Sequence, residues 1–479
     1  MPRSTALTSR VLTLALPALA SLIAEPLFTL IDSSMIGHLG TNELAGQAVA
    51  SQILMTAITL FIFLSYSTTS LSARALGSGD ERKAIRSGID AIWLACGLGI
   101  ITTALLIVLG PTLTGLFHTT PEVAPHALSY LYSAAPGTIG MFITMAAVGT
   151  FRGVQDTRTP MVITLIGTLL NILLNALFIY GFEWGVAGSG AGTSLAQTAM
   201  GAVMAGLVLR HAHTLNIPLS ASRSGLWGAV LEGGPLMVRG MSLRLVGLLL
   251  LWPATTLGTK AVASYQIILS IWIFACFLLD ALAIAAQAMV GISVGSKNQS
   301  QLRELLHTLN LWGLWTGVLI GITIAITSPW LPYLFTSDTA MYSITTWGLI
   351  ASALGMPIGG VVFLLDGVLI GAGEGRFMAT ASVLQLLITL PALAVVNYLC
   401  TQGISPEKGV AALWMVYCVF YMGSRLFCNV WRTWYSPQHA LITRPSRSHR
   451  SHKNALHFPL FTPLSKSRII STSGADTHK

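Results

Sequence analysis

Apolar residues dominate long stretches of this chain, and short polar segments separate one stretch from the next. Each stretch has about 20 residues or more, the length at which a helix crosses the roughly 30 Å hydrocarbon core of a bilayer. Strands of an outer-membrane barrel would instead appear as segments of about ten residues with alternating polarity, and the sequence shows no such alternation. The pattern therefore predicts an all-α integral membrane protein with twelve transmembrane helices, over residues 11–37, 48–73, 88–110, 126–150, 160–182, 186–210, 227–256, 261–291, 307–328, 340–366, 377–400 and 409–432.

Lysine and arginine are distributed unevenly between the loops on the two sides of these predicted helices. The loops on the side of the N-terminus carry eleven of them, whereas the loops on the other side carry only Lys260 and Lys408. Loops rich in Lys and Arg face the cytoplasm. We therefore expect a multi-pass protein of the plasma membrane with both termini cytoplasmic. The eleven residues are Arg74, Arg82, Lys83, Arg86, Arg152, Arg158, Arg210, Arg223, Lys297, Arg303 and Arg376.

The composition agrees with membrane insertion, because 53% of the residues are hydrophobic and 9% are charged, against about 25% charged in soluble proteins. The net charge of +9 owes much to the last 40 residues, which hold seven basic residues and one acid. Residues 433–479 lack periodicity, so they are predicted to be a disordered cytoplasmic tail rather than a nucleic-acid-binding domain. The five cysteines form no C-x-x-C pair, so neither a disulfide framework, a metal site nor a bound cofactor is expected.

The sequence contains an internal duplication with an offset of 218 residues: "LGTNELAG" at 39–46 aligns with "LGTKAVAS" at 257–264, and "GTFRGVQDTR" at 149–158 aligns with "GVLIGAGEGR" at 367–376. Each copy has six spans, an even number, so both copies enter the membrane from the same side. The two halves are then related by an axis along the membrane normal, and a binding site is expected between them. The predicted parts are an N-lobe over 1–210, a cytoplasmic linker over 211–226 and a C-lobe over 227–432.

Charged residues inside the predicted spans are not repeated between the two copies. Asp32, for example, aligns with Leu250, and Arg239 aligns with Ser21. A feature present in only one copy is not required by the repeated fold, and it is therefore a candidate for function. The candidates are Glu25, Asp32, Arg239, Arg244, Asp280 and Asp366, together with the asparagines Asn171 and Asn175.

Asp32 is the strongest of these candidates. A carboxylate at mid-helix costs roughly 2.5–3.5 kcal/mol on insertion scales, and desolvation disfavours its ionised form. Such a carboxyl can take up a proton from one side of the membrane and release it on the other. Asn171 and Asn175 are four residues apart, hence on one helical face, and are expected to hydrogen-bond to it. Glu25 lies about 10 Å earlier on nearly the same face, where it can relay protons, meet a cationic substrate, or pair with an arginine.

Pro17 and Pro26 interrupt the hydrogen-bond ladder of the first helix and give it two points at which to bend. Protonation of Asp32 can then favour a straight or a bent helix, which supplies the two-state element that a switch requires.

In the C-lobe, a buried Arg239–Asp280 ion pair is expected, since losing one partner of a buried pair costs about 3–5 kcal/mol. Alternatively, Arg239, Arg244, Asp280 and Asp366 line a cavity and contact the substrate. Two arginines at such a cavity suit anionic or zwitterionic solutes as well as cations.

The stretches "LIDSSMIGHLG", "FRGVQDTRTPMVITLIGTLLNILLNALFIYG" and "LDALAIAAQAMVG" resemble multidrug and toxin extrusion (MATE) transporters of the DinF-like branch. The resemblance covers about residues 10–432. It implies two six-helix lobes around a V-shaped central cavity and antiport of small organic solutes, xenobiotics among them, against protons or sodium. Asp32, Asn171 and Pro17 match the family's coupling aspartate, its nearby asparagine and its bend. Asn175 replaces a second acid of many relatives, and the seventh-span glutamate of sodium-coupled relatives is missing, which favours protons over sodium.

Three other classes of function are weighed against an antiporter. A lipid-linked oligosaccharide flippase is the alternative of related fold, and it predicts a strongly cationic cavity and extra spans. A membrane enzyme would need a His, Cys or carboxylate cluster, and neither G-x-S-x-G nor H-E-x-x-H occurs. A receptor or scaffold gives no reason for intramembrane acids in only one copy. The expected partners are membrane lipids and small organic substrates, with no nucleic acid, and the protein is expected to act as a monomer.

Overall fold

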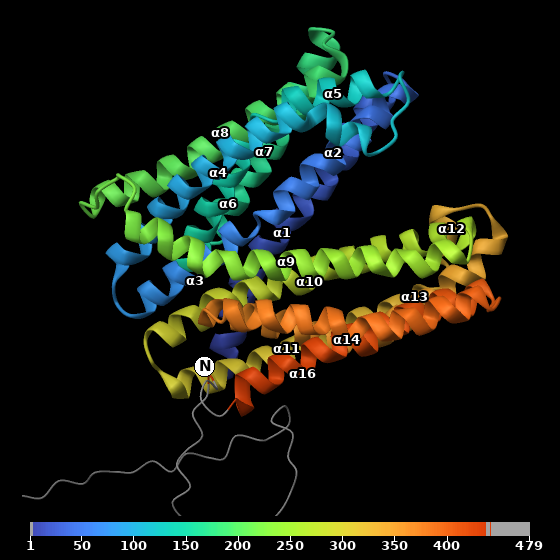
Figure 1. Ribbon diagram of the computed structural model, residues 1–479. Helices are drawn as coiled ribbons and strands as arrows, with labels where there is room; N and C mark the ends of the chain where they lie inside the picture. The colour runs from blue at the N-terminus through green and yellow to red at the C-terminus, as the bar shows by residue number, and fades with distance from the viewer. Residues whose placement is uncertain (1–2, 437–440, 442–479) are drawn as a thin grey trace, which may run out of the picture. The chain divides into compact units, whose positions relative to one another are not determined.

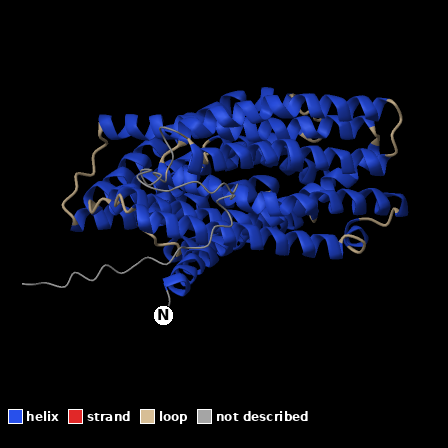
Figure 2. Cartoon of the chain, turned by 90° about the horizontal axis from the view of Figure 1, so that it is seen from below, coloured by secondary structure: helices blue, strands red, loops and turns tan. Residues whose placement is uncertain are grey.

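The computed structural model describes residues 3–436 and 441, and for residues 3–6 and 25 it describes the backbone alone. Helices make up nearly all of this part of the chain (Figures 1 and 2). They are α1 (Arg3–Gly37), α2 (Thr41–Leu60), α3 (Phe63–Gly77), α4 (Glu81–Gly115), α5 (Ala124–Ala134), α6 (Gly137–Gly153), α7 (Arg158–Ala176), η1 (Leu177–Gly181), α8 (Gly185–Thr214), α9 (Arg223–Thr256), α10 (Thr259–Gly295), α11 (Gln299–Thr327), α12 (Leu331–Phe335), α13 (Thr339–Ala372), α14 (Gly375–Thr401), α15 (Pro406–Val416), η2 (Tyr417–Met422), α16 (Gly423–Val430) and η3 (Trp431–Tyr435).

The prediction of twelve spans is confirmed. Eleven helical segments of the described chain are long and apolar enough to cross a membrane, and α5 and α6 together form a twelfth that is bent by 49°. Pro136 lies at this bend, where it removes a backbone donor and clashes with the preceding turn. Successive spans run in opposite directions. The end of the bundle at which α3, α6, α8, α10 and α13 finish is called the basic end below, because its loops carry most of the arginines.

The described helices form two six-span lobes, each with its own apolar core. In Figure 1, α2 to α8 gather on one side and α9 to α16 on the other. The N-lobe core centres on residues such as Leu64, Phe142 and Met204, and the C-lobe core on residues such as Ile268 and Met356. Burial of such side chains is worth about 1.5–3 kcal/mol each in water, whereas in lipid close packing contributes instead.

The first helix of each lobe contacts helices of both lobes. The beginning of α1 joins a cluster with α10, α11 and α13 that includes Val11, Leu14 and Leu305, while α1 also contacts α7. In the same way α9 contacts α3 and α4 of the N-lobe and α14 of the C-lobe. Pro17 in α1 and Pro235 in α9 occupy equivalent positions of the repeat. Helices α1 and α9 therefore each carry a proline at the same position of the repeat, and the backbone hydrogen-bond ladder is interrupted there.

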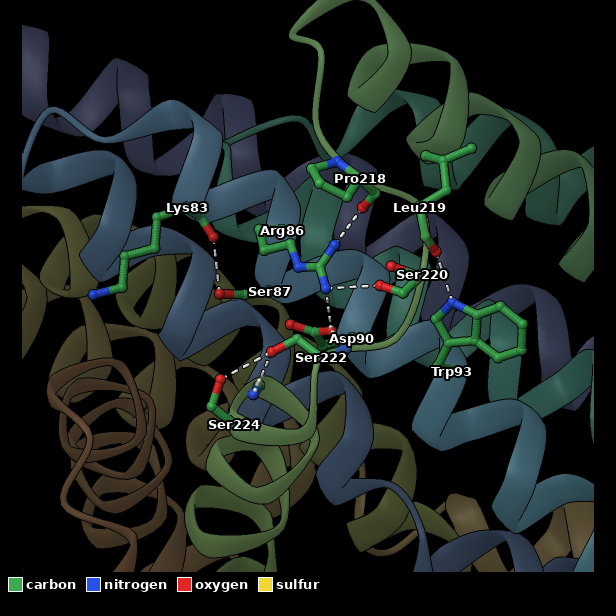
Figure 3. A network of polar contacts seen from close by, with 11 residues as sticks. Lys83, Arg86, Ser87, Asp90, Trp93, Pro218, Leu219, Ser220, Ser222 and Ser224 are labelled. Atoms are coloured by element: carbon green, nitrogen blue, oxygen red, sulfur yellow. Dashed lines mark hydrogen bonds and ion pairs between the residues drawn. The ribbon is translucent and has the colours of Figure 1, made fainter.

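The linker between the lobes is shorter than the predicted 211–226, because α8 continues to Thr214 and α9 begins at Arg223. Figure 3 shows how it is held. Arg86 of α4 donates to the carbonyls of Pro218 and Ser220, and Trp93 donates to the Leu219 carbonyl over 2.8 Å.

The start of α9 is also fixed to the N-lobe. Buried Asp90 of α4 forms an ion pair with Arg86 (3.3 Å) and accepts the backbone N–H of Ser222 over 2.9 Å. Ser222 in turn caps α9 by accepting the N–H of Gly225 over 3.1 Å, the usual role of serine at a helix start. At the other end of the C-lobe the last span reaches Tyr435, a few residues beyond the predicted 432. Of the predicted tail, residues 437–440 and 442–479 lie outside the described residues.

Candidate transport site

Asp32 lies inside the N-lobe in a cage of hydrogen-bond donors from four other helices. Its side chain is 2% exposed. One carboxylate oxygen accepts Nε2 of Gln47 (α2) over 2.5 Å and the hydroxyl of Tyr130 (α5) over 3.5 Å. The other accepts Nδ2 of Asn175 (α7) over 2.7 Å and the hydroxyl of Ser189 (α8). Four donors on one carboxylate favour its ionised form, which offsets part of the cost of burial.

The same cage can also serve the protonated carboxyl. The amide oxygens of Gln47 and Asn175 are buried and have no hydrogen-bond partner among the described residues. When Asp32 carries a proton it becomes a donor, and rotation of either amide presents an acceptor to it. The side-chain amide of Asn175 has room beside Asp32 because residue 192 of α8 is a glycine. A Cβ at Gly192 would come within 2.1 Å of the Asn175 amide oxygen. Protonation therefore rearranges the contacts of α1 with α2 and α7.

Of the residues predicted to accompany Asp32, Asn175 contacts it and Asn171 does not. Asn171 is 2% exposed and lies one turn earlier on α7, where it lines a cavity and its amide oxygen has no partner in the described structure. The side chain of Glu25 lies outside the described residues. Pro17 and Pro26 are both inside α1. Neither of the two central cavities described next is lined by Asp32, so the cage is separate from them.

Two cavities, each lined mostly by one lobe, meet at residues that they share. The C-cavity, of about 310 Å³, is lined mainly by α9, α10, α13 and the last span. The N-cavity, of about 330 Å³, is lined mainly by α3, α6 and α7. Both are lined by Tyr66, Asp280 and Ile284. Tyr66 and Ile284 are equivalent positions of the repeat, so the cavities join on the pseudo-twofold axis, where transporters of this architecture bind their substrates.

The expected Arg239–Asp280 pair is not formed, and Arg239 pairs instead with Asp366 of α13, over 2.6 Å. Asp366 also pairs with Arg425 of α16 and accepts Nδ2 of Asn429 over 2.8 Å. The Arg425 guanidinium lies 5.4 and 5.6 Å from the ring centroids of Tyr421 and Phe363, within cation–π range. Arg239, Asp366 and Arg425 are called the triad below. Its charges are satisfied by one another, with one positive charge in excess.

The remaining predicted residues divide between the cavity and the surface. Asp280 lines both cavities, whereas Arg244 is exposed on α9 and lines neither. Arg152, assigned to a loop by the sequence pattern, lies on α6 and lines the N-cavity. The sequence did carry a signal for the two missed arginines, since the repeat aligns Arg152 with Ile370 and Arg425 with Leu207. Both are charges present in one copy alone.

A wall of aromatic rings completes the C-cavity. Trp272 and Trp414 have ring centroids 5.4 Å apart, and Tyr417 meets both edge-on at 5.2 and 5.6 Å. Tyr265 lies 5.9 Å from Trp414. Such a surface binds flat apolar groups. Among the described residues no group of three or more His, Cys, Asp or Glu side chains is arranged to hold a metal ion.

Comparison with known proteins agrees with this architecture. The MatE family model matches residues 17–177 and 235–396, two segments that begin 218 residues apart, as the internal repeat does. The Arabidopsis thaliana protein DETOXIFICATION 44, chloroplastic, is 28% identical over 435 residues, which cover 88% of this chain and 81% of that protein. The DNA damage-inducible protein F of Escherichia coli K12 is 26% identical over 439 residues, with 88% and 93% covered.

Solved structures show the same fold. A MATE transporter of Vibrio cholerae in the bent form has a TM-score of 0.80 at 21% identity and covers 90% of this chain and 96% of that chain. A transporter of the MOP superfamily from Pyrococcus furiosus, whose title reports reverse polarity of its binding pocket, has a TM-score of 0.79 at 20% identity, with 88% and 94% covered. The helices, the duplication and the family match lead to one conclusion: the chain belongs to the MatE family of multidrug and toxin efflux transporters and is not an enzyme.

Proposed function

We propose that this protein exports small organic solutes in exchange for protons, with the central cavities opening alternately to the two sides of the membrane. The observation that carries the proposal is the cage of Asp32. It places one buried carboxyl among donors that stabilise its ionised form and amide oxygens that can accept its proton. A group able to exist in both states is the minimum that proton coupling needs.

The position of Asp32 on α1 links the proton to the motion of the lobes. Because α1 contacts α7 of the N-lobe and α10 of the C-lobe, a change in its hydrogen bonds acts on both lobes at once. Pro17 and Pro26 lie inside α1 and interrupt its hydrogen-bond ladder, which gives the helix two points at which it can bend. Structural relatives are described in a bent form and in a straight conformation. We infer that protonation of Asp32 shifts α1 between two such shapes.

Protons suit the cage better than sodium does. A bound cation needs several oxygen ligands at once, so both amides, which present N–H groups to Asp32 in the described structure, would have to rotate to hold it. A proton needs only the carboxyl and one acceptor. The alternative of a flippase is less well supported, because the described chain has twelve spans and its cavities hold two aspartates beside their three arginines.

The basic end is proposed to face the cytoplasm, by the same excess of Lys and Arg that orients membrane proteins generally. Both termini are then cytoplasmic, and the membrane is proposed to be the plasma membrane. The relative DETOXIFICATION 44 is described as chloroplastic, so fluorescence microscopy of the tagged full chain decides the membrane.

The experiment that tests the function is export by the purified full chain in proteoliposomes, with pH and sodium gradients imposed separately. A fluorescent organic cation and a fluorescent zwitterion are loaded as probes. The proposal expects a pH gradient alone to drive export and a sodium gradient alone to leave it at the rate of protein-free vesicles. Export driven by a sodium gradient at constant pH would show that the coupling ion is sodium and not the proton.

A further inference from the structure

Two opposite charges face the N-cavity without a partner. Arg152 of α6 and Asp280 of α10 both line it, and none of the described residues forms an ion pair or hydrogen bond with either side chain. The charges of the triad, in contrast, are bound to one another. An unpaired charge inside a membrane span is expensive, and such residues are associated with ligand or ion binding rather than with the fold.

Arg152 and Asp280 form no direct ion pair, since no nitrogen of the one lies within 4.0 Å of an oxygen of the other, although each lies in the electrostatic field of the other and Asp280 lies also in that of Arg239. They come from opposite lobes and belong to one space, with Tyr66 at the junction of the two cavities. A ligand that bridges them therefore contacts both lobes. A guanidinium binds a carboxylate through two parallel hydrogen bonds, and a carboxylate binds an ammonium group in the same charge-assisted way.

Uncharged polar groups of the N-cavity independently indicate a ligand. The hydroxyls of Ser65 and Thr144 and the amide oxygen of Asn171 are buried with no hydrogen-bond partner in the described chain. Ser65 is 5% and Asn171 is 2% exposed. Buried polar atoms in proteins almost always have a partner, and these three lie along the wall of one cavity. Once these side chains rotate toward the cavity, a polar solute in it can supply the missing hydrogen bonds.

The adjoining C-cavity adds an apolar surface. The rings of Trp272, Trp414 and Tyr417 lie within 5.2 to 5.6 Å of one another and line the C-cavity beside Asp280. A solute bound at Asp280 can therefore place an aromatic or other flat group against this wall.

We propose that the transported solute is an aromatic zwitterion, with its cationic nitrogen bound to Asp280, its anionic group bound to Arg152 and its ring against the wall of the C-cavity. This rests on the proposed function, since it names the substrate class of the same transporter. A solute with only a positive charge leaves Arg152 without a counter-ion, and a solute with only a negative charge leaves Asp280 without one. Either case leaves one charge inside a membrane span without a direct ion-pair partner, which is costly.

The test uses three dansyl probes with the same fluorophore and nearly the same chain: dansyl-lysine as the zwitterion, dansylcadaverine as the cation and dansyl-aminohexanoate as the anion. Each is titrated against the full chain in lipid nanodiscs, and fluorescence enhancement gives Kd. Because the zwitterion makes one more charge-assisted contact than either analogue, we expect it to bind at least about tenfold more tightly than either of them. Equal or tighter binding of the cation or of the anion would overturn the proposal.

Two variants then assign the charges. Arg152→Gln should weaken the zwitterion about tenfold or more and leave the cation unchanged or tighter, whereas Asp280→Asn should weaken the zwitterion and leave the anion unchanged or tighter. Loss of structure does not produce this crossed pattern, and a folded variant that bound all three probes equally more weakly would count against the proposal. Arg158→Gln and Glu122→Gln, at exposed sites outside both cavities, are the matched controls and should bind as the parent does. If a variant does not fold, the Kd values of the parent protein for the three probes still test the proposal.

Failure of this inference is distinguishable from failure of the proposed function. Selective binding of the zwitterion without export driven by a pH gradient supports the substrate class and removes the proton coupling. Export driven by a pH gradient, together with tighter binding of the cation or the anion, supports proton coupling and refutes the zwitterion as the preferred substrate class.

Discussion

Gly77 of α3 and Gly295 of α10 are equivalent positions of the repeat, and each lies against the backbone of the other's helix. A Cβ on Gly77 would come within 2.2 Å of the carbonyl oxygen of Ile292, and a Cβ on Gly295 within 2.1 Å of the carbonyl oxygen of Arg74. Arg74 and Ile292 are themselves equivalent. The two helices therefore cross on the pseudo-twofold axis at the basic end, at a separation that only glycine permits.

An ion pair strengthens this contact between the lobes. The Arg74 guanidinium lies 2.6 Å from a carboxylate oxygen of Glu232, on α9. Ser70 donates to the Gly371 carbonyl over 3.3 Å. The described state is thus one in which the lobes touch closely at the basic end. If that end is cytoplasmic, as proposed, the cavities are closed to the cytoplasm.

Gly295→Leu is expected to open this contact. The side chain would overlap the α3 backbone, and overpacking of this kind costs about 1–3 kcal/mol, enough to change the ratio of the two states by about 5- to 150-fold. Spin labels on the basic ends of α3 and α11 should report longer distances by pulsed electron paramagnetic resonance. Gly97→Leu is the control, because a Cβ at this position of α4 would have no neighbouring atom within 4 Å. An unchanged distance distribution in Gly295→Leu would show that the crossing does not hold the lobes together.

Gly192→Ala is expected to disable proton coupling although Asp32 itself is not replaced. Its Cβ would lie 2.1 Å from the amide oxygen of Asn175, so Asn175 must move and its hydrogen bond to Asp32 is lost. We expect pH-driven export to fall well below that of the parent, with a stability loss of about 1–3 kcal/mol. Gly206→Ala on the same helix, where nothing lies within 4 Å, should transport normally. Normal transport by Gly192→Ala would mean that Asn175 is dispensable to the cage.

Asp366→Asn should destabilise the C-lobe, because it leaves buried Arg425 and half-buried Arg239 without their shared counter-ion. Removal of one member of a buried ion pair costs about 3–5 kcal/mol, which thermal unfolding of the purified protein detects. Replacing Arg425 as well, in the double variant Asp366→Asn and Arg425→Met, should recover most of the lost stability. A double variant no more stable than Asp366→Asn alone would assign the loss to packing rather than to charge.

The helices and the repeat were predictable from the sequence, because both depend on patterns along the chain. The twelve spans follow from apolar length, and the importance of Asp32 follows from its cost inside a span. The partners of these charges were not predictable, since they are fixed by packing between helices far apart in sequence. Gln47, Tyr130 and Ser189 are uncharged polar residues of a kind common in membrane helices, and nothing local marks them as donors to Asp32.

The choice between Asp280 and Asp366 as the partner of Arg239 shows the same limit. Both aspartates lie in C-lobe spans of similar apolar character, and only the arrangement of α9, α13 and α16 brings Arg239 and Arg425 to Asp366. Arg152 was assigned to a loop because it stands beside a polar segment, yet α6 continues past it to Gly153. The linker was predicted too long for a similar reason, since polar residues such as His211 and His213 extend α8.

The central claim is that Asp32 carries the proton that drives export, and Asp32→Asn in proteoliposomes tests it most directly. Binding of a dansyl probe and its exchange across the membrane without a gradient are measured beside export under a pH gradient. Asp338→Asn, at an exposed carboxylate paired with Lys260, is the control, since surface ion pairs contribute only about 0–1 kcal/mol. The account predicts that Asp32→Asn keeps binding and exchange but exports no faster than protein-free vesicles when the pH gradient is imposed. Export by Asp32→Asn at the rate of the parent protein, under the same gradient, would contradict it.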